Sequence, residues 1–117
     1  MQYLLLIYAS EAEGAKQDPA VMTTAIKDYG EFTKSIIQAG QFKAGDRLKP
    51  TSTATTVRVR NGKTVTTDGP FAETREQLGG YYLVEAKNLG EATGIAARIP
   101  GAKWGSIEVR PIWPKAG

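Results

Sequence analysis

Three carboxylates surround a Gly-Pro turn near the middle of this chain, and they are the residues best suited to chemistry. Asp68 precedes Gly69 and Pro70, and Glu73 and Glu76 follow shortly after. A carboxylate on an apolar surface loses water, which raises its pKa and makes it a better acid or base near neutral pH. Asp68 is therefore a candidate general acid/base, although an Asp before Gly also commonly caps its own turn. Glu73 is a candidate ligand-binding residue; with Glu76 it could instead hold a divalent cation or begin a solvated helical turn.

Two tyrosines and an arginine are the other candidates for ligand contact. Tyr81 and Tyr82 lie in an apolar run after this turn, where they could line a pocket or donate a hydrogen bond. Arg110 alternates with apolar residues near the end of the chain and could clamp an anionic ligand. The alternatives are packing for at least one tyrosine, and an ion pair with Glu108 for Arg110.

Two residue types that carry much of enzyme chemistry are absent from the 117 residues: histidine and cysteine. Without histidine there is no imidazole base for a serine nucleophile and no imidazole ligand for zinc or haem. Without cysteine, thiolate catalysis, thiolate metal sites and disulfides are excluded. We expect no metal and no organic cofactor.

Charge and hydropathy indicate a soluble protein of one domain that does not bind nucleic acid or membranes. The net charge is +3, and the densest basic cluster is only Arg58, Arg60 and Lys63, as on a solvated hairpin. The apolar run over residues 1–8 lacks a basic start and is too short for a signal peptide or a membrane span. We expect a cytoplasmic location.

The first half of the chain predicts a strand and a long helix. Residues 2–9 form a strand that is apolar on both faces. Asp18-Pro19 supplies the cap and first position of a helix that Gly40 ends. Gly30 within this helix is expected to permit close packing on a sheet. The apolar stripe of the helix consists of Met22, Ile26, Tyr29, Phe32 or Thr33, and Ile36.

The rest of the chain predicts a strand, a hairpin, another strand, a second helix and a last strand. A strand over 41–48, with a bulge expected at Gly45-Asp46, precedes a hairpin. A strand over 80–86, a helix capped by Asn88 and a strand over 106–112 follow. The order is two split β-α-β halves with an inserted hairpin, which predicts an α+β, ferredoxin-like fold.

The hairpin determines which way Asp68 points. A two-residue turn at Asn61-Gly62 makes Thr55 face Asp68. Opposed residues share a face, so Asp68 is predicted on the face of Val57 and Val59 unless a bulge intervenes.

Both helices are expected on one face of the sheet, which leaves apolar side chains on the other. An exposed aromatic sheet face is an association site. We predict a homodimer in which two sheets pack face to face into a barrel with a cleft between them; a monomer with an apolar open face is the alternative.

The motif DGPFAE at 68–73, followed by QL at 77–78 and GGYYLVE at 79–85, resembles the DGPF-type members of the YCII-related family. DRLKP at 46–50 and IEVRPI at 107–112 agree with this resemblance, which spans nearly the whole chain. It implies a dimeric α+β barrel. Some relatives carry a His-Asp pair in the cleft. Because this chain has no histidine, only the Asp of that pair has a counterpart here, Asp68. Others occur beside, or fused to, alternative sigma factors, which implies a regulatory role.

Three hypotheses remain open, and whether the protein is an enzyme is not decided. The first is a homodimer that binds a small organic molecule in its cleft, with Asp68 as a weak acid/base and Tyr81, Tyr82, Arg110 and Glu73 as ligand contacts. The second is a non-catalytic regulatory module that binds a protein of sigma-factor-dependent transcription. The third is a barrel that kept its fold and lost its activity.

Overall fold

A four-stranded antiparallel sheet organises the chain. The computed structural model describes residues 1–115. In spatial order the strands are β2 (Phe42–Arg47), β5 (Gln77–Glu85), β1 (Gln2–Ala9) and β6 (Ser106–Pro111). All three pairings are antiparallel. With one long helix after β1 and another after β5, this order confirms the predicted α+β, ferredoxin-like class.

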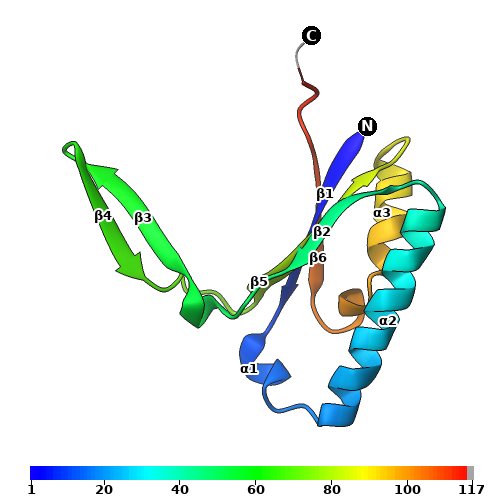
Figure 1. Ribbon diagram of the computed structural model, residues 1–117, viewed down its shortest axis with the longest axis horizontal. Coiled ribbons are helices and arrows are strands. Elements are labelled where there is room, and N and C mark those ends of the chain that lie inside the picture. Colours follow the sequence, from blue (N-terminus) through cyan, green and yellow to red (C-terminus); the bar gives the residue numbers. More distant parts are fainter. Residues whose placement is uncertain (116–117) are drawn as a thin grey trace.

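Two helices lie on the same side of the sheet (Figure 1): α2 (Pro19–Gln38) and α3 (Leu89–Arg98). Both begin at the predicted caps. The Asp18 carboxylate accepts a hydrogen bond from the Ala20 N–H at 2.8 Å, and Asn88 Oδ1 accepts from the Glu91 N–H at 2.9 Å. These bonds satisfy backbone donors that a helix start leaves unpaired.

The hydrophobic core lies between this sheet face and the helices. The predicted alternation along β1 is confirmed, because Tyr3 and Leu5 are buried beneath the helices. The Tyr82 ring meets the Phe32 ring edge-on, with centroids 5.2 Å apart. The other buried apolar residues are Ile36, Val84, Ala86, Ala92, Ile95, Ala96 and Ile99.

Only the C-terminal half of α2 packs into this core. Met22 and Ile26, predicted as part of the buried stripe, are 48% and 59% exposed. The prediction that Gly30 permits close packing of the helix on the sheet is also wrong, since a Cβ added at Gly30 would meet nothing within 4 Å. The N-terminal half of α2 therefore has an apolar surface that the core does not use.

The irregular segments differ in detail from the predictions. The expected loop after β1 contains the short helix α1 (Glu11–Gly14), and short 3-10 turns occur at η1 (Thr51–Thr53) and η2 (Pro100–Lys103). The irregularity in β2 lies between Phe42 and Ala44 instead of at Gly45-Asp46. Gly45 has a different role, because a Cβ there would lie 2.8 Å from the Tyr82 ring.

Strands β3 (Thr55–Arg60) and β4 (Lys63–Asp68) form a separate two-stranded sheet, the hairpin arm, which projects away from the body (Figure 1). The predicted register is confirmed, with Thr55 opposite Asp68. Asn61 and Gly62 both have positive φ, 52° and 75°, as a type I′ turn requires. The radius of gyration is 16.3 Å, above the roughly 13 Å expected for a compact chain of this length.

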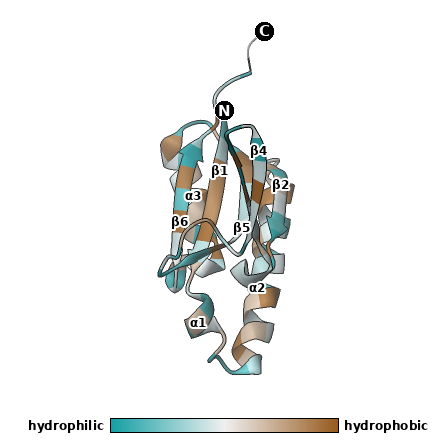
Figure 2. Cartoon of the chain, turned by 90° about the vertical axis from the view of Figure 1, so that its left-hand side faces the viewer, coloured by the Kyte–Doolittle hydropathy of each residue, from teal (hydrophilic) through white to brown (hydrophobic). Residues whose placement is uncertain are grey.

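Within residues 1–115, no helix covers the sheet face opposite α2 and α3. The alternation that buries Tyr3 and Leu5 directs Leu4, Leu6 and Tyr8 to this open face, where each is partly exposed. Figure 2 views the molecule from this side and shows hydrophobic segments along β1. No helix within residues 1–115 combines the length and apolar composition that a membrane crossing requires.

Candidate functional site

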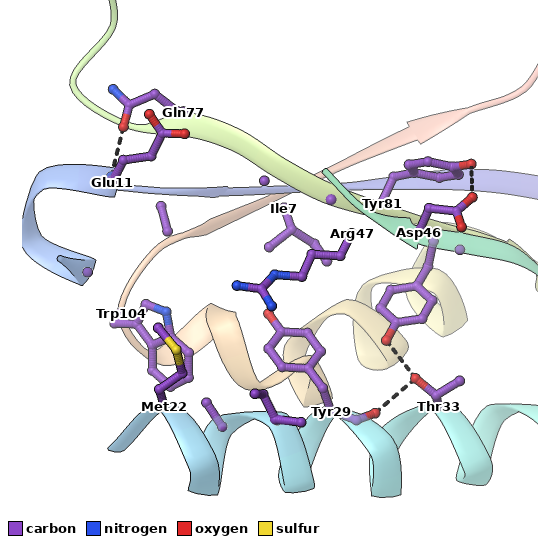
Figure 3. Close-up of a pocket in the computed structure, with 18 of the residues that line it drawn as sticks. Ile7, Glu11, Met22, Tyr29, Thr33, Asp46, Arg47, Gln77, Tyr81 and Trp104 are labelled. Atoms are coloured by element: carbon purple, nitrogen blue, oxygen red, sulfur yellow. Dashed lines mark hydrogen bonds between the residues drawn. The ribbon is translucent and has the colours of Figure 1, made fainter. Parts of the chain in front are cut away.

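A cavity of about 550 Å³ lies between the N-terminal half of α2 and the adjoining ends of β1, β2 and β5 (Figure 3). Its walls are mostly apolar. Met22 and Ile26 come from α2, Ile7 from β1 and Trp104 from the segment before β6. The cavity thus occupies the space that the incompletely packed half of α2 leaves open.

Glycines on the sheet side keep this space free. Gly45, Gly79 and Gly80 all line the cavity. At Gly80 the strands approach so closely that an added Cβ would lie 2.9 Å from the Asp46 carbonyl oxygen. Gly80 therefore permits close strand pairing at the cavity wall.

Hydroxyl groups occupy the inner end of the cavity. Thr33 Oγ1 donates to the Tyr29 carbonyl at 2.9 Å and lies 2.6 Å from the Tyr82 hydroxyl. Because the single Thr33 proton is already used, Tyr82 is the donor in this second bond. The Tyr29 hydroxyl accepts a hydrogen bond from the Gly101 N–H at 3.1 Å. Burial raises the pKa of Tyr29, and the bond from Gly101 partly opposes that rise.

Three charged residues border the cavity, and two are engaged elsewhere. The Glu11 carboxylate accepts from the Thr51 N–H at 2.9 Å and the Thr51 hydroxyl at 2.6 Å. The Asp46 carboxylate accepts from the Tyr81 hydroxyl at 2.7 Å, which raises the pKa of Tyr81. The third is Arg47, whose guanidinium points toward the Tyr29 hydroxyl in Figure 3. None of the ion pairs within residues 1–115 includes Arg47.

Of the five residues selected from the sequence, only Tyr81 and Tyr82 line this cavity. Asp68 is exposed at the end of β4, and Glu73 is exposed in the following loop. The desolvation expected for Asp68 is therefore absent in the single chain. Arg110 is exposed and pairs with Glu108, which was the alternative considered for it.

The alternative cation site is not assembled. In the described part of the chain, no three acidic side chains lie close enough together to hold a metal ion. Glu76 instead accepts a hydrogen bond from the Ser106 hydroxyl at 2.8 Å. The carboxylates around the Gly-Pro turn thus act separately in this structure.

Sequence reasoning missed most of the cavity. Met22, Ile26 and Tyr29 have helical spacing that is equally typical of a core stripe. Arg47 had no distinguishing signal, because the irregularity early in β2 breaks the alternation from which its direction could be predicted. The signals that could have indicated the cavity were the long apolar stripe of α2 and the tyrosine pair Tyr81 and Tyr82.

Comparison with known proteins agrees with this architecture. The model of the YCII-related domain matches residues 1–116. The chain belongs to the YCII-related family. A YCII-related chain of similar length, "Uncharacterized protein R00369" from Rhizobium meliloti (strain 1021), is 36% identical over 114 residues, which cover 96% of this chain and 92% of that protein. The match therefore includes the body, the hairpin arm and the cavity.

Proposed function

We propose that this YCII-related protein binds a small, largely apolar organic molecule in the cavity beneath α2. The cavity itself is the observation that supports this function. Its volume of about 550 Å³ falls within the range of roughly 300–1,000 Å³ typical of small-molecule sites. Met22 and Ile26 leave about half of their surface in water, so an apolar ligand that covered them would gain from the hydrophobic effect.

A cavity-filling variant tests this function. Ile26→Trp would place an indole ring in the cavity mouth, whereas Ile37→Trp makes the same change on an exposed part of α2 that does not line the cavity. Amide spectra recorded during a screen of small organic compounds should show shifts around residues 22–29 in wild type and in Ile37→Trp. Compounds that bind Ile26→Trp equally well would refute the assignment.

The proposal includes a homodimer formed through the open face of the sheet. Leu4, Leu6 and Tyr8 support it, because a partly exposed apolar face of this kind commonly marks an interface. The ligand cavity lies on the helix side of the sheet, so dimerisation would leave it accessible. Light scattering should report two subunits for wild type and for Thr23→Lys on α2, and one subunit for Leu6→Lys. A wild-type mass of one subunit would refute the dimer.

Acid/base catalysis by Asp68 is the least supported part of the proposal. Asp68 does not line the cavity, so it would act there only if a second subunit brought it close. If any ligand found in the screen is also converted, Asp68→Asn should abolish conversion while binding persists. Unchanged turnover in Asp68→Asn would eliminate this role.

A protein-binding function is the second candidate, and the hairpin arm favours it. Val57 and Val59 are 59% and 61% exposed, and Phe71 in the loop after the arm is 80% exposed. Affinity capture from the native host with wild type and with Val57→Ser/Val59→Ser should recover a transcription regulator only with wild type. Recovery of this chain alone with both baits would argue against this function.

A further inference from the structure

We infer that the ligand is an organic acid whose carboxylate is bound by Arg47 and Tyr29, an inference that rests on the proposed ligand-binding function. The cavity combines apolar walls with one cationic side chain. Such a combination fits a molecule with an apolar body and a single negative charge.

The strand register brings Arg47 to the cavity. Arg47 is paired with Gly80 of β5. It is one of the cavity-lining residues, whereas Asp46 beside it bonds Tyr81. Gly80 has no side chain to occupy the space next to Arg47, and its backbone is close enough to β2 that a Cβ would lie 3.6 Å from the Arg47 Cα. The guanidinium can therefore extend beneath the sheet toward Tyr29 (Figure 3).

Neither of the two carboxylates that line the cavity is paired with Arg47. The two lining carboxylates have other donors: Thr51 for Glu11, and Tyr81 for Asp46. Arg47 takes part in no ion pair formed within residues 1–115. Its guanidinium protons are thus available to a carboxylate, with which they would form charge-assisted hydrogen bonds.

Two side chains of the cavity, Tyr29 and Arg47, have unused donors. The protons of Thr33 and Tyr82 are both used within the network at the inner end. The Tyr29 hydroxyl accepts from Gly101, and no acceptor within the described residues is paired with its own proton. Tyr29 therefore has a free proton to donate and Arg47 can only donate, whereas an ionised carboxylate can only accept. The planar guanidinium also matches the two oxygens of a carboxylate.

The apolar residues that line the cavity determine which apolar group the ligand can carry. Met22, Ile26 and Trp104 are about half exposed and border the cavity. Methionine and tryptophan side chains adapt to aliphatic and aromatic groups. The site is therefore suited to an alkyl or aryl-alkyl monocarboxylic acid.

Two probes of the same carbon skeleton separate charge recognition from apolar burial: 4-phenylbutanoate and 4-phenylbutan-1-ol. Trp104 lines the cavity and reports binding by its fluorescence, in a Trp113→Phe background that removes the exposed second tryptophan. We expect the acid to bind at least about tenfold more tightly than the alcohol, as one charge-assisted hydrogen bond provides. Arg47→Gln should remove this preference and leave alcohol binding unchanged. Arg58→Gln, the same change on the hairpin arm, should preserve the preference.

The outcomes distinguish this inference from the proposed function. Two results would overturn the carboxylate assignment: equal affinity for acid and alcohol in the protein with an intact Arg47, or a preference for the acid that persists in Arg47→Gln. Neither result would contradict small-molecule binding itself. If neither probe binds and the compound screen also finds nothing, both are overturned. Unchanged alcohol binding by Arg47→Gln shows that the cavity of the variant is intact.

Discussion

The hydrogen bond between Thr33 and Tyr82 tests whether Tyr82 serves mainly the fold, although it was selected from the sequence as a ligand contact. Its hydroxyl lies 2.6 Å from Thr33 Oγ1, and the residue is only 8% exposed. Thr33→Val keeps the shape of the side chain and removes this acceptor. The buried phenol would then lack its partner, which is more costly than the absence of both groups.

The expected energies follow from which group is left unpaired. Thr33→Val orphans the Tyr82 proton and should lower the free energy of unfolding by about 1.5 kcal/mol. Tyr82→Phe should cost less, about 0.5–1 kcal/mol, because Thr33 still bonds the Tyr29 carbonyl. In the double variant no phenol remains to be orphaned. Its loss should therefore be smaller than the sum of the two single losses by about 1 kcal/mol.

Urea unfolding followed by circular dichroism measures all four proteins. With a slope of about 1.5 kcal/mol per molar, Thr33→Val should lower the midpoint by about 1 M. Tyr81→Phe is the matched control, because its hydroxyl bonds Asp46 at an exposed position, and its midpoint should change far less than that of Thr33→Val. Additivity of the two core substitutions within about 0.3–0.5 kcal/mol would refute the assigned bond.

Three further predictions concern other parts of the chain. Gly30→Ala should stabilise the protein by about 1 kcal/mol in the same urea assay, since the helix gains propensity and the new methyl group meets nothing within 4 Å; a loss of stability would contradict the exposed position of Gly30. Gly80→Ala should instead destabilise it, because its Cβ would lie 2.9 Å from a backbone oxygen, and an unchanged midpoint would show that the strands are farther apart. Tyr81 should titrate above its ordinary pKa of 10.0, and Asp46→Asn should lower that pKa toward 10.0 in an ultraviolet absorbance titration. Because the folded pKa is raised, the stability that this bond contributes is present below pH 10 and is lost as pH rises through the folded pKa of Tyr81; identical titrations of the two proteins would exclude the bond.

Local patterns were sufficient to predict most of the elements. Asp18 and Asn88 were identified as helix caps from side chains that bond the backbone two or three residues away. Asn61-Gly62 determined the hairpin register, because a two-residue turn permits one pairing and the pairing follows residue by residue. These features depend on neighbours in the sequence, so they could be derived without the fold.

The positions of the candidate residues relative to one another could not be derived in this way. Asp68 and Tyr82 are close in sequence, yet the hairpin arm ends outside the cavity and β5 continues into the core. A pattern of apolar residues indicates that a face is buried, but it does not identify the element that packs against that face.

The sequence by itself determined the order of strands and helices, the helix starts, the hairpin register and the lack of imidazole and thiol chemistry. Only the tertiary structure decided that half of α2 stands clear of the sheet, and that Arg47 and Tyr29 line the same cavity. The physical reason is that caps and turns are made by short-range bonds. A cavity is made by the mismatch between surfaces that are distant in the chain, and no local pattern encodes that mismatch.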